Sequence, residues 1–249
     1  MKHERKLRLV HTSDVHLETD LFGTGETGAI LRGRVRAAFS SVIELANSRE
    51  ADLMLIVGDL FDSSRIEPGA VEFAMNEIAR ARMPVVMVPG NHDAHDERSL
   101  YADLPATAVP RNLHLILEAA GRTIDFDALS ALVWGRALVE HSPEYHPLSG
   151  IPAPADDRWN IALAHGLFTG TDTSERSSQI TAAEVASSGY DYIALGHVHV
   201  FGDASCGDTA AFYCGTPSPL NGAGRSGSAA CVDLIPGKAP IVESVSIVV

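Results

Sequence analysis

The most constraining feature of this sequence is an alternation of apolar strand-like runs and amphipathic helical segments over residues 7–88. Leu7 to Thr12, Leu53 to Val57 and Pro84 to Val88 are short apolar runs of strand length. Between them, two segments carry apolar residues at helical spacing: Val35, Ala38, Phe39, Val42, Ile43 and Ala46, then Val71, Ala74, Met75 and Ile78 after a helix-starting Pro68. This order predicts parallel strands joined by right-handed crossovers.

The rest of the chain shows weaker helical patterns. Further strand candidates are His114 to Leu117, Thr123 to Phe126, Ala131 to Trp134, Ile161 to Ala164, Tyr192 to Leu195, Ala211 to Cys214, Ala229 to Leu234 and Ile241 to Val248. Loops are expected at Gly23 to Gly33, which is glycine-rich, and at His141 to Asp157, which is rich in proline and acid. A capping box from Thr181 to Glu184 predicts a short helix. Without a repeat or a long linker, residues 1–249 are expected to form a single domain.

Composition favours a globular protein. The length of 249 residues fits one large domain, with 45% hydrophobic and 20% charged residues. The longest apolar runs fall well short of the ~20 residues that cross a bilayer. The charged N-terminus lacks the apolar segment of a signal peptide, so a cytoplasmic location is expected. The three cysteines, Cys206, Cys214 and Cys231, are interpreted as small buried hydrophobes, because their number and spacing suit neither disulfides nor a zinc site.

The formal net charge of -13 argues against a surface that grips nucleic acid over its whole extent. Two divalent cations would offset part of this charge at one place. The best local basic group is Arg32, Arg34 and Arg36, which is a candidate for contact with a phosphate. A solvated helix start explains the same three residues equally well.

Polar, ligand-type side chains follow five of the predicted strands. They are Asp14 and His16, then Asp59, then Asn91, His92 and Asp93, then His165, and finally His197 and His199. In an open α/β sheet the ligand crevice lies outside the carboxyl ends of the strands. Carboxylate and imidazole together suit manganese, iron or zinc, and one aspartate can bridge two ions ~3.5–4 Å apart. Each motif alone is also explained by turn chemistry, but five together favour a pair of metal ions.

These motifs resemble the signature of the calcineurin-like metallophosphoesterases, which runs D-x-H, G-D-x-x-D, G-N-H-D, H and G-H-x-H over about Leu7 to Val200. The resemblance implies a four-layer α-β-β-α sandwich of two mixed sheets flanked by helices. The middle and the C-terminal third of the chain would then form the second sheet.

The resemblance also implies roles for the motif residues. Asp14, His16 and His199 would hold one ion, Asn91, His165 and His197 the other, and Asp59 would bridge them. An activated water would attack phosphorus, with His92 beside the phosphate stabilising charge or protonating the leaving oxygen and Asp93 orienting His92. Asp62 is expected to position the loop after the second strand.

Within that superfamily, three segments look like the SbcD-type DNA repair exonucleases: His11 to Leu17, Gly58 to Asp62, and Cys214 to Pro219. This similarity implies a DNA phosphodiesterase activated by manganese, with iron or zinc as alternatives, and a possible SMC-like ATPase partner. The region after Pro219 is glycine-rich and does not predict a partner-binding helix, and no capping domain is expected. Two alternatives stay open: a small-molecule phosphodiesterase or phosphatase, and a non-catalytic metal-binding scaffold. His92 argues against the scaffold, which has no need of it.

Several residues lie outside the motifs. His11 is interpreted as a packing residue or a second contact behind the ligands. His141 and His146 are expected to be exposed in the proline-rich loop. Trp134 and Trp159 are expected to fill the space between the sheets.

Overall fold

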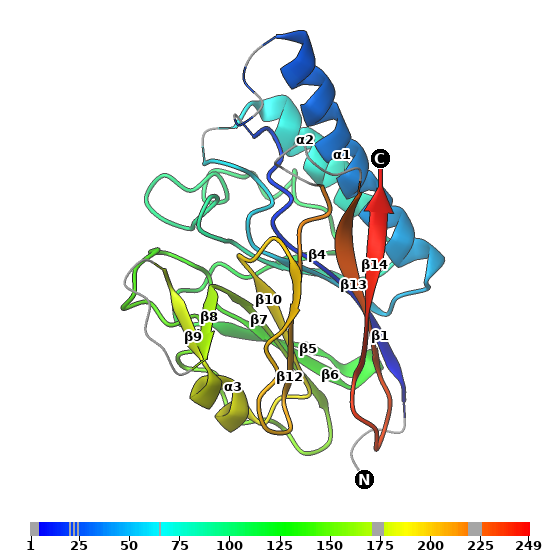
Figure 1. The fold of residues 1–249 in the computed structure, drawn as a ribbon, viewed down its shortest axis with the longest axis vertical. Coiled ribbons are helices and arrows are strands. Elements are labelled where there is room, and N and C mark those ends of the chain that lie inside the picture. Colours follow the sequence, from blue (N-terminus) through cyan, green and yellow to red (C-terminus); the bar gives the residue numbers. More distant parts are fainter. Residues whose placement is uncertain are drawn as a thin grey trace.

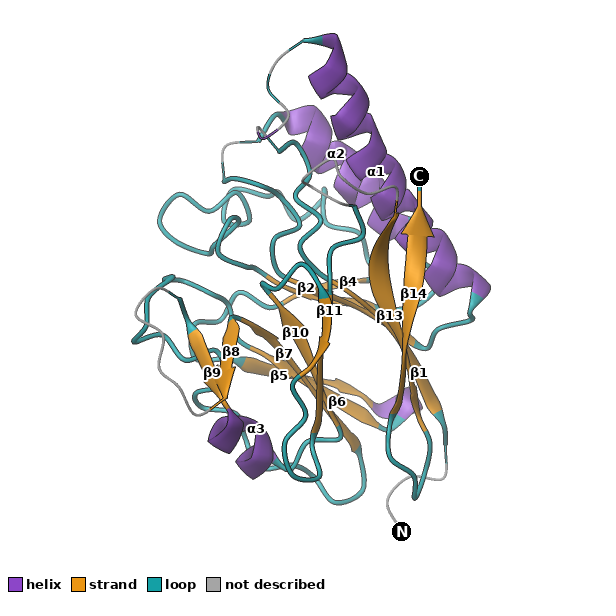
Figure 2. Ribbon diagram, viewed as in Figure 1, coloured by secondary structure: helices purple, strands orange, loops and turns teal. Residues whose placement is uncertain are grey.

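The computed structural model describes residues 5–19, 21, 23, 25–64, 66–170, 177–218 and 226–249. Within these residues, two six-stranded sheets pack against each other, and helices cover their outer faces (Figure 1). Figure 2 shows the same layers by secondary structure, with α1 and α2 on one side and α3 on the other. The four-layer α-β-β-α sandwich expected from the sequence is therefore confirmed.

The first sheet has the order β14-β13-β1-β2-β3-β4. Its parallel strands are β1 (Leu7–Thr12), β2 (Leu53–Val57), β3 (Val85–Val88) and β4 (Leu113–Leu115), and the antiparallel hairpin β13 (Ser226–Leu234) and β14 (Ile241–Val248) extends it beside β1. Helices α1 (Glu26–Ser48) and α2 (Pro68–Ala79) pack on its outer face.

The second sheet has the order β11-β12-β10-β7-β6-β5. Its strands are β5 (Arg122–Phe126), β6 (Ala131–Gly135), β7 (Trp159–His165), β10 (Tyr192–Gly196), β11 (Phe201–Asp203) and β12 (Ala210–Cys214), with the 3-10 turn η2 (Asp127–Leu129) between β5 and β6. Its outer face carries α3 (Ala182–Ser188) and the small pair β8 (Leu167–Gly170) and β9 (Gln179–Thr181). The predicted capping box opens α3, because Thr181 Oγ1 accepts from the backbone N–H of Glu184.

The core explains why the first strands read as continuous apolar runs. In β2, Leu53 and Leu55 face the second sheet, while Met54 and Ile56 face the helices. Every residue of this strand is buried, as expected for a parallel strand covered on both faces.

The structure corrects two expectations about secondary structure. The loop expected at Gly23 to Gly33 is helical from Glu26 onward, and Gly25 at its N-terminus adopts φ 99°. The C-terminal third does not belong wholly to the second sheet: β13 and β14 join the first, as does β4. The reason is pairing, since Val232 and Leu234 of β13 lie opposite residues of β1 and contribute to the core between the sheets.

Smaller corrections concern side chains. Trp159 packs between the sheets as expected, but Trp134 packs on the outer face of the second sheet. The loop from His141 to Asp157 is not wholly superficial, because Tyr145 and Leu148 within it are buried. The short strands β8, β9 and β11 were not expected. The glycine-rich segment after Pro219 lies outside the described residues as far as residue 225. Among the described residues, no helix combines the length and apolarity needed to cross a membrane.

One polar contact bridges the apolar core between the sheets. His11 on β1 is fully buried, and its Nδ1 lies 3.0 Å from the hydroxyl oxygen of Tyr192 on β10. Burial lowers the pKa of His11 from 6.5 to about 3. The folded protein therefore keeps His11 neutral at pH values where the unfolded chain protonates it.

We predict that the free energy of unfolding falls as the pH drops from 6.5 toward 3, the window between the unfolded and folded pKa values of His11. The contribution of this residue is fully present above that window and decreases within it by up to about 1.4 kcal/mol per pH unit. The test is urea unfolding in chelator at several pH values. His11→Gln cannot titrate and should show a shallower loss, so equal slopes for the two proteins would contradict the prediction.

Candidate metal centre

The C-terminal ends of five parallel strands meet at one end of the sandwich. Three belong to the first sheet (β1, β2 and β3) and two to the second (β7 and β10). The approach is close: a Cβ added at Gly196 would lie 1.9 Å from the carbonyl oxygen of Val57, and one added at Gly58 would lie 2.2 Å from His165 Nδ1. The glycines before the candidate ligands are therefore required by contact between the sheets.

Four of the candidate ligands have left-handed backbone. The φ angles are 54° at Asp14, 53° at His16, 53° at Asp59 and 101° at His197. Such angles are uncommon for residues with a Cβ and cost on the order of 1–3 kcal/mol each. The fold holds these side chains in strained conformations that aim them into one place.

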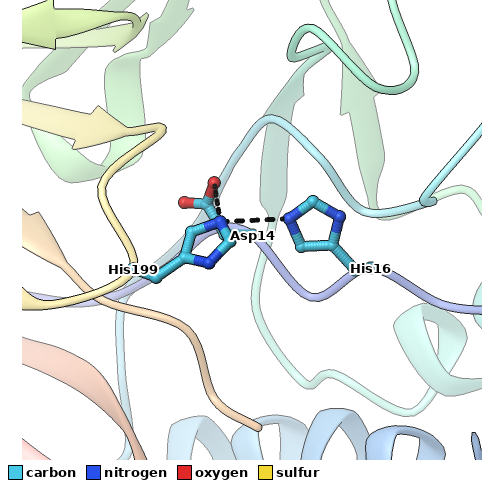
Figure 3. Close-up of side chains that lie close together, drawn as sticks. All are labelled: Asp14, His16 and His199. Atoms are coloured by element: carbon cyan, nitrogen blue, oxygen red, sulfur yellow. Dashed lines mark hydrogen bonds and ion pairs between the residues drawn. The ribbon is translucent and has the colours of Figure 1, made fainter. Parts of the chain in front are cut away.

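Asp14, His16 and His199 form the first group of side chains (Figure 3). His199 Nε2 lies 3.5 Å from Asp14 Oδ1 and 3.3 Å from His16 Nε2. Asp14 is completely buried, and its carboxylate also accepts from the backbone N–H of His197 at 3.0 Å. This group combines one carboxylate and two imidazoles from the segments that follow β1 and β10.

Asn91, His165 and His197 form the second group. Asn91 Oδ1 lies 3.0 Å from His165 Nε2 and 2.9 Å from His197 Nδ1. These residues come from the loops after β3 and β10 and from the last residue of β7. The structure thus brings together each of the two triads expected from the sequence resemblance.

Asp59 lies between the two groups. Its Oδ2 is 3.4 Å from His165 Nε2 and 3.8 Å from His16 Nε2, while Oδ1 accepts from the backbone N–H of His92 at 2.8 Å. Burial alone would raise the pKa of Asp59, but His165 beside it holds that pKa well below the usual range. One carboxylate therefore faces both groups, in the place where a bridging ligand would stand.

The imidazoles differ in their protonation. Burial alone would lower the pKa of His165, but the nearby carboxylate of Asp59 raises it to about 9. Burial lowers the pKa of His197 to about 4. The bond to Asp14 raises the pKa of His199. The histidines beside carboxylates thus provide positive charge where the acids need it.

Two of the imidazoles are fixed by acceptors on their outer nitrogens. His16 Nδ1 lies 2.8 Å from Asp62 Oδ1, and His165 Nδ1 lies 2.9 Å from the carbonyl oxygen of Val57. An acceptor at Nδ1 keeps the proton there and leaves Nε2 free to bind a cation. The side chain of Asp62 thus holds the ring of His16, and its expected role in positioning its own loop stays a prediction.

His92 stands at the open side of the cluster. Its side chain is 43% exposed, and its ring lies edge-on to that of His16 with 4.6 Å between centroids. Its Nδ1 donates to the carbonyl oxygen of Asp62 at 3.0 Å. With His16 and Asp59 it also forms a group close enough to hold a metal, so its expected role as a neighbour of the metals stays a prediction.

Asp93 is completely buried and binds backbone rather than the ring of His92. Its carboxylate accepts from the N–H groups of Gly90 at 2.7 Å, Asp59 at 3.1 Å and Phe61 at 3.2 Å, and from the hydroxyl of Tyr101 at 2.5 Å. It therefore ties the loops after β2 and β3 together. A direct catalytic role for Asp93 stays a prediction.

The expected phosphate-binding arginines lie on α1. Arg36 forms an ion pair with Glu18 at 2.6 Å, and Arg32 donates to the carbonyl oxygen of Gly23 at 2.9 Å and lies 4.0 Å from Glu18. Arg34 is exposed. The carboxylate of Glu18 thus partly neutralises Arg32 and Arg36. Contact of the three arginines with substrate stays a prediction.

Three residues that support the site were not predicted from the motifs. Thr216 donates from its hydroxyl to the carbonyl oxygen of Asp14 at 2.7 Å. Tyr101 completes the shell of Asp93, and Ser177 Oγ lies 3.0 Å from His197 Nε2. Thr216 falls in the segment that looked SbcD-like, but Tyr101 and Ser177 belong to no motif, 8 and 20 residues from their partners.

The donor set fits divalent cations. Asp14 and Asp59 are buried carboxylates whose ion pairs, in the described part of the chain, are all with histidines. Carboxylate, imidazole and amide oxygen are ligands that manganese, iron and zinc accept. Two divalent ions would supply the positive charge that such a buried acidic pair requires.

This fold and this donor set define the class of metal-dependent phosphoesterases. The chain belongs to the calcineurin-like phosphoesterase family, whose model matches residues 7–201. Members of this family typically bind two divalent metal ions. The resemblance inferred from the five motifs is confirmed.

Two curated relatives are similar at modest identity. The uncharacterized metallophosphoesterase YhaO of Bacillus subtilis is 27% identical over 78% of this chain and 48% of its own length. The DNA double-strand break repair protein Mre11 of Methanopyrus kandleri is 26% identical over 86% of this chain and 49% of its own length. The chain thus spans about half the length of both relatives.

Solved structures support the fold alone. TT1561 of Thermus thermophilus aligns with a TM-score of 0.59 at 13% identity, covering 98% of this chain and 100% of that chain. A dimetal phosphatase from Danio rerio aligns with a TM-score of 0.56 at 11% identity, covering 97% and 98% respectively.

We predict that Asp93→Asn destabilises the protein more than Tyr101→Phe does. The asparagine amide would turn N–H donors toward backbone N–H donors, for a loss of about 3 kcal/mol or more, whereas Tyr101→Phe removes a single donor and costs about 1–2 kcal/mol. Urea unfolding in the presence of a chelator measures the free energy of unfolding of both variants. Equal losses would show that the backbone contacts of Asp93 do not hold the loops.

Proposed function

We propose that this chain is a two-metal phosphodiesterase that cleaves DNA, with manganese as its activating ion. The carrying observation is the position of Asp59 between the two groups of side chains, 3.4 Å from His165 and 3.8 Å from His16. Asp14, His16 and His199 would hold one ion, and Asn91, His165 and His197 the other. When bound, two divalent ions would lower the pKa of a water nucleophile and offset negative charge on the phosphoryl oxygens.

His92 is assigned the proton transfer. Because a carbonyl oxygen only accepts, the contact with Asp62 requires His92 Nδ1 to carry a proton. Nε2 is then the nitrogen left to exchange a proton with substrate, on a side chain that is 43% exposed. In this role His92 acts as the imidazolium, which keeps its Nδ1 proton on the Asp62 carbonyl and gives its Nε2 proton to the leaving oxygen of the ester.

DNA is favoured as the substrate by sequence similarity. The relative from Methanopyrus kandleri that matches 86% of this chain is named as a DNA double-strand break repair protein. The segment from His11 to Leu17 points to the same group. An SMC-like ATPase partner belongs to this proposal, as does action on DNA ends.

A second candidate is a phosphodiesterase or phosphatase for small molecules such as cyclic nucleotides. The observation that favours it is electrostatic. The net charge is -13, and two of the three candidate phosphate-binding arginines are already close to Glu18. Such a chain offers little positive surface to a long phosphate backbone.

The metal and substrate assignments predict manganese-dependent cleavage. Chelator-stripped protein should gain activity on bis-p-nitrophenyl phosphate and on linear double-stranded DNA when manganese is added. Asp59→Ala should abolish both activities by removing the shared ligand, while the exposed control Asp103→Ala should retain them.

A substrate panel with DNA, cyclic nucleotides and p-nitrophenyl phosphate separates the two candidates. Turnover of cyclic nucleotides without cleavage of DNA would select the second. No manganese-dependent turnover of any phosphoester would leave the metal-binding scaffold as the surviving interpretation.

His92→Gln should keep manganese bound and lower the rate on DNA by ~10²–10⁴-fold, the usual contribution of an acid–base group. The loss on bis-p-nitrophenyl phosphate should be smaller, because p-nitrophenolate leaves without needing a proton. Rates and bound manganese are measured on the same samples. Loss of one manganese ion from His92→Gln would show that His92 is a ligand.

A further inference from the structure

The ring of His197 is held from behind by two residues that lie outside the five motifs. Its Nε2 lies 3.0 Å from Ser177 Oγ, and the same oxygen lies 3.0 Å from His141 Nε2. Ser177 is 4% exposed. The rings of His141 and His197 are also in edge contact, with 5.4 Å between centroids and 67° between planes. The proline-rich loop expected at the surface thus reaches the candidate metal centre.

The anchor of His197 differs in kind from those of the candidate ligands His16 and His165. His16 is fixed by the carboxylate of Asp62, and His165 by a backbone carbonyl. Both of these anchors only accept hydrogen bonds. Ser177 offers a hydroxyl, which accepts on one side and donates on the other, so its orientation is set by its second neighbour, His141.

The hydrogen bonds in this chain of three side chains have one consistent direction when His197 binds a cation. Its Nδ1 faces Asn91 and His165 and is the nitrogen available to an ion, which leaves the ring proton on Nε2. Nε2 then donates to Ser177 Oγ, and the hydroxyl of Ser177 donates to Nε2 of a neutral His141. Each contact is satisfied without burying a further charge.

His141 is held in place by its own loop. The guanidinium of Arg136 stacks on the ring of Tyr145 at 4.4 Å and donates to the carbonyl oxygen of His146 at 2.9 Å. The hydroxyl of Tyr145 donates to the carbonyl oxygen of Ala137. These contacts close the loop on both sides of His141, so its contact with Ser177 is built into the fold.

We propose that Ser177 and His141 are positioning residues that set the ring of His197 for the ion held with Asn91 and His165. The inference rests on the proposed two-metal function and deepens it. A neutral hydroxyl strengthens an imidazole ligand less than a carboxylate does, so this ion is the more weakly held of the two. The ion held by Asp14, His16 and His199 has the carboxylate of Asp62 behind it and binds first.

The test measures binding of manganese to chelator-stripped protein by equilibrium dialysis, with free Mn²⁺ followed by its paramagnetic resonance signal. Wild-type protein should bind two ions with unequal affinity. Ser177→Ala and His141→Phe should weaken only the second step, by ~10–100-fold, the usual effect of losing the partner behind a ligand. Ser177→Thr keeps the hydroxyl and should bind the second ion with the affinity of the wild type.

Two matched controls separate positioning from loop packing. Ser178→Ala removes the neighbouring hydroxyl, which donates to the carbonyl oxygen of Glu140, and His146→Phe removes the other loop imidazole, which pairs with Glu184. Both should bind two ions as the wild type does. A loss in these controls equal to that in Ser177→Ala would overturn the proposal, as would unchanged binding in both Ser177→Ala and His141→Phe.

The outcome is distinguishable from failure of the proposed function. Two bound manganese ions with a selective effect of Ser177 and His141, but without hydrolysis of any phosphoester, would refute the enzyme and support the positioning role. A wild type that binds fewer than two ions would overturn both. If Ser177→Ala does not fold, as judged by its thermal unfolding in chelator, His141→Phe carries the test from a more exposed position.

Discussion

The burial of two carboxylates, Asp14 and Asp59, where the sheets meet is the constraint on which the rest of the structure depends. Removing such groups from water costs several kcal/mol per charge unless partners replace the lost hydration. Here the partners are imidazoles and backbone N–H groups delivered from both sheets. The packing of the two sheets therefore depends on the same side chains and backbone groups that form the candidate metal centre at one end of the sandwich.

This constraint explains why the supporting contacts come from so many parts of the chain. Asp93 gathers the loops after β2 and β3, and Thr216, from the segment after β12, holds the backbone of Asp14. Gly196 and Gly58 let the two sheets approach to a distance that a Cβ would forbid. Each contact restricts the conformations open to a ligand-bearing loop. The candidate ligands are therefore preorganised before any ion or substrate binds.

Local patterns predicted much of this arrangement. The bounds of β1, β2 and β14 agree with the apolar runs, because strands that are buried or alternate in exposure leave a direct trace in the sequence. The prediction of a loop at Gly23 to Gly33 was wrong because its glycines, which are typical of loops, lie partly within the first turns of α1. The sequence did not predict that β13 and β14 join the first sheet. Their pairing with β1 joins segments that are far apart in sequence, and the local pattern of apolar residues does not identify the partner strand. Ser177 and His141 were missed as partners of His197 for the same reason.

The left-handed backbone at Asp14, His16, Asp59 and His197 has a consequence for how this protein can change. Strain of on the order of 1–3 kcal/mol at each position is comparable in sum to the net stability of a typical domain. Glycine at any of them would relieve strain while deleting a candidate ligand. Substitutions that stabilise the fold would then remove the candidate ligands, so stability and metal binding oppose each other at these four positions.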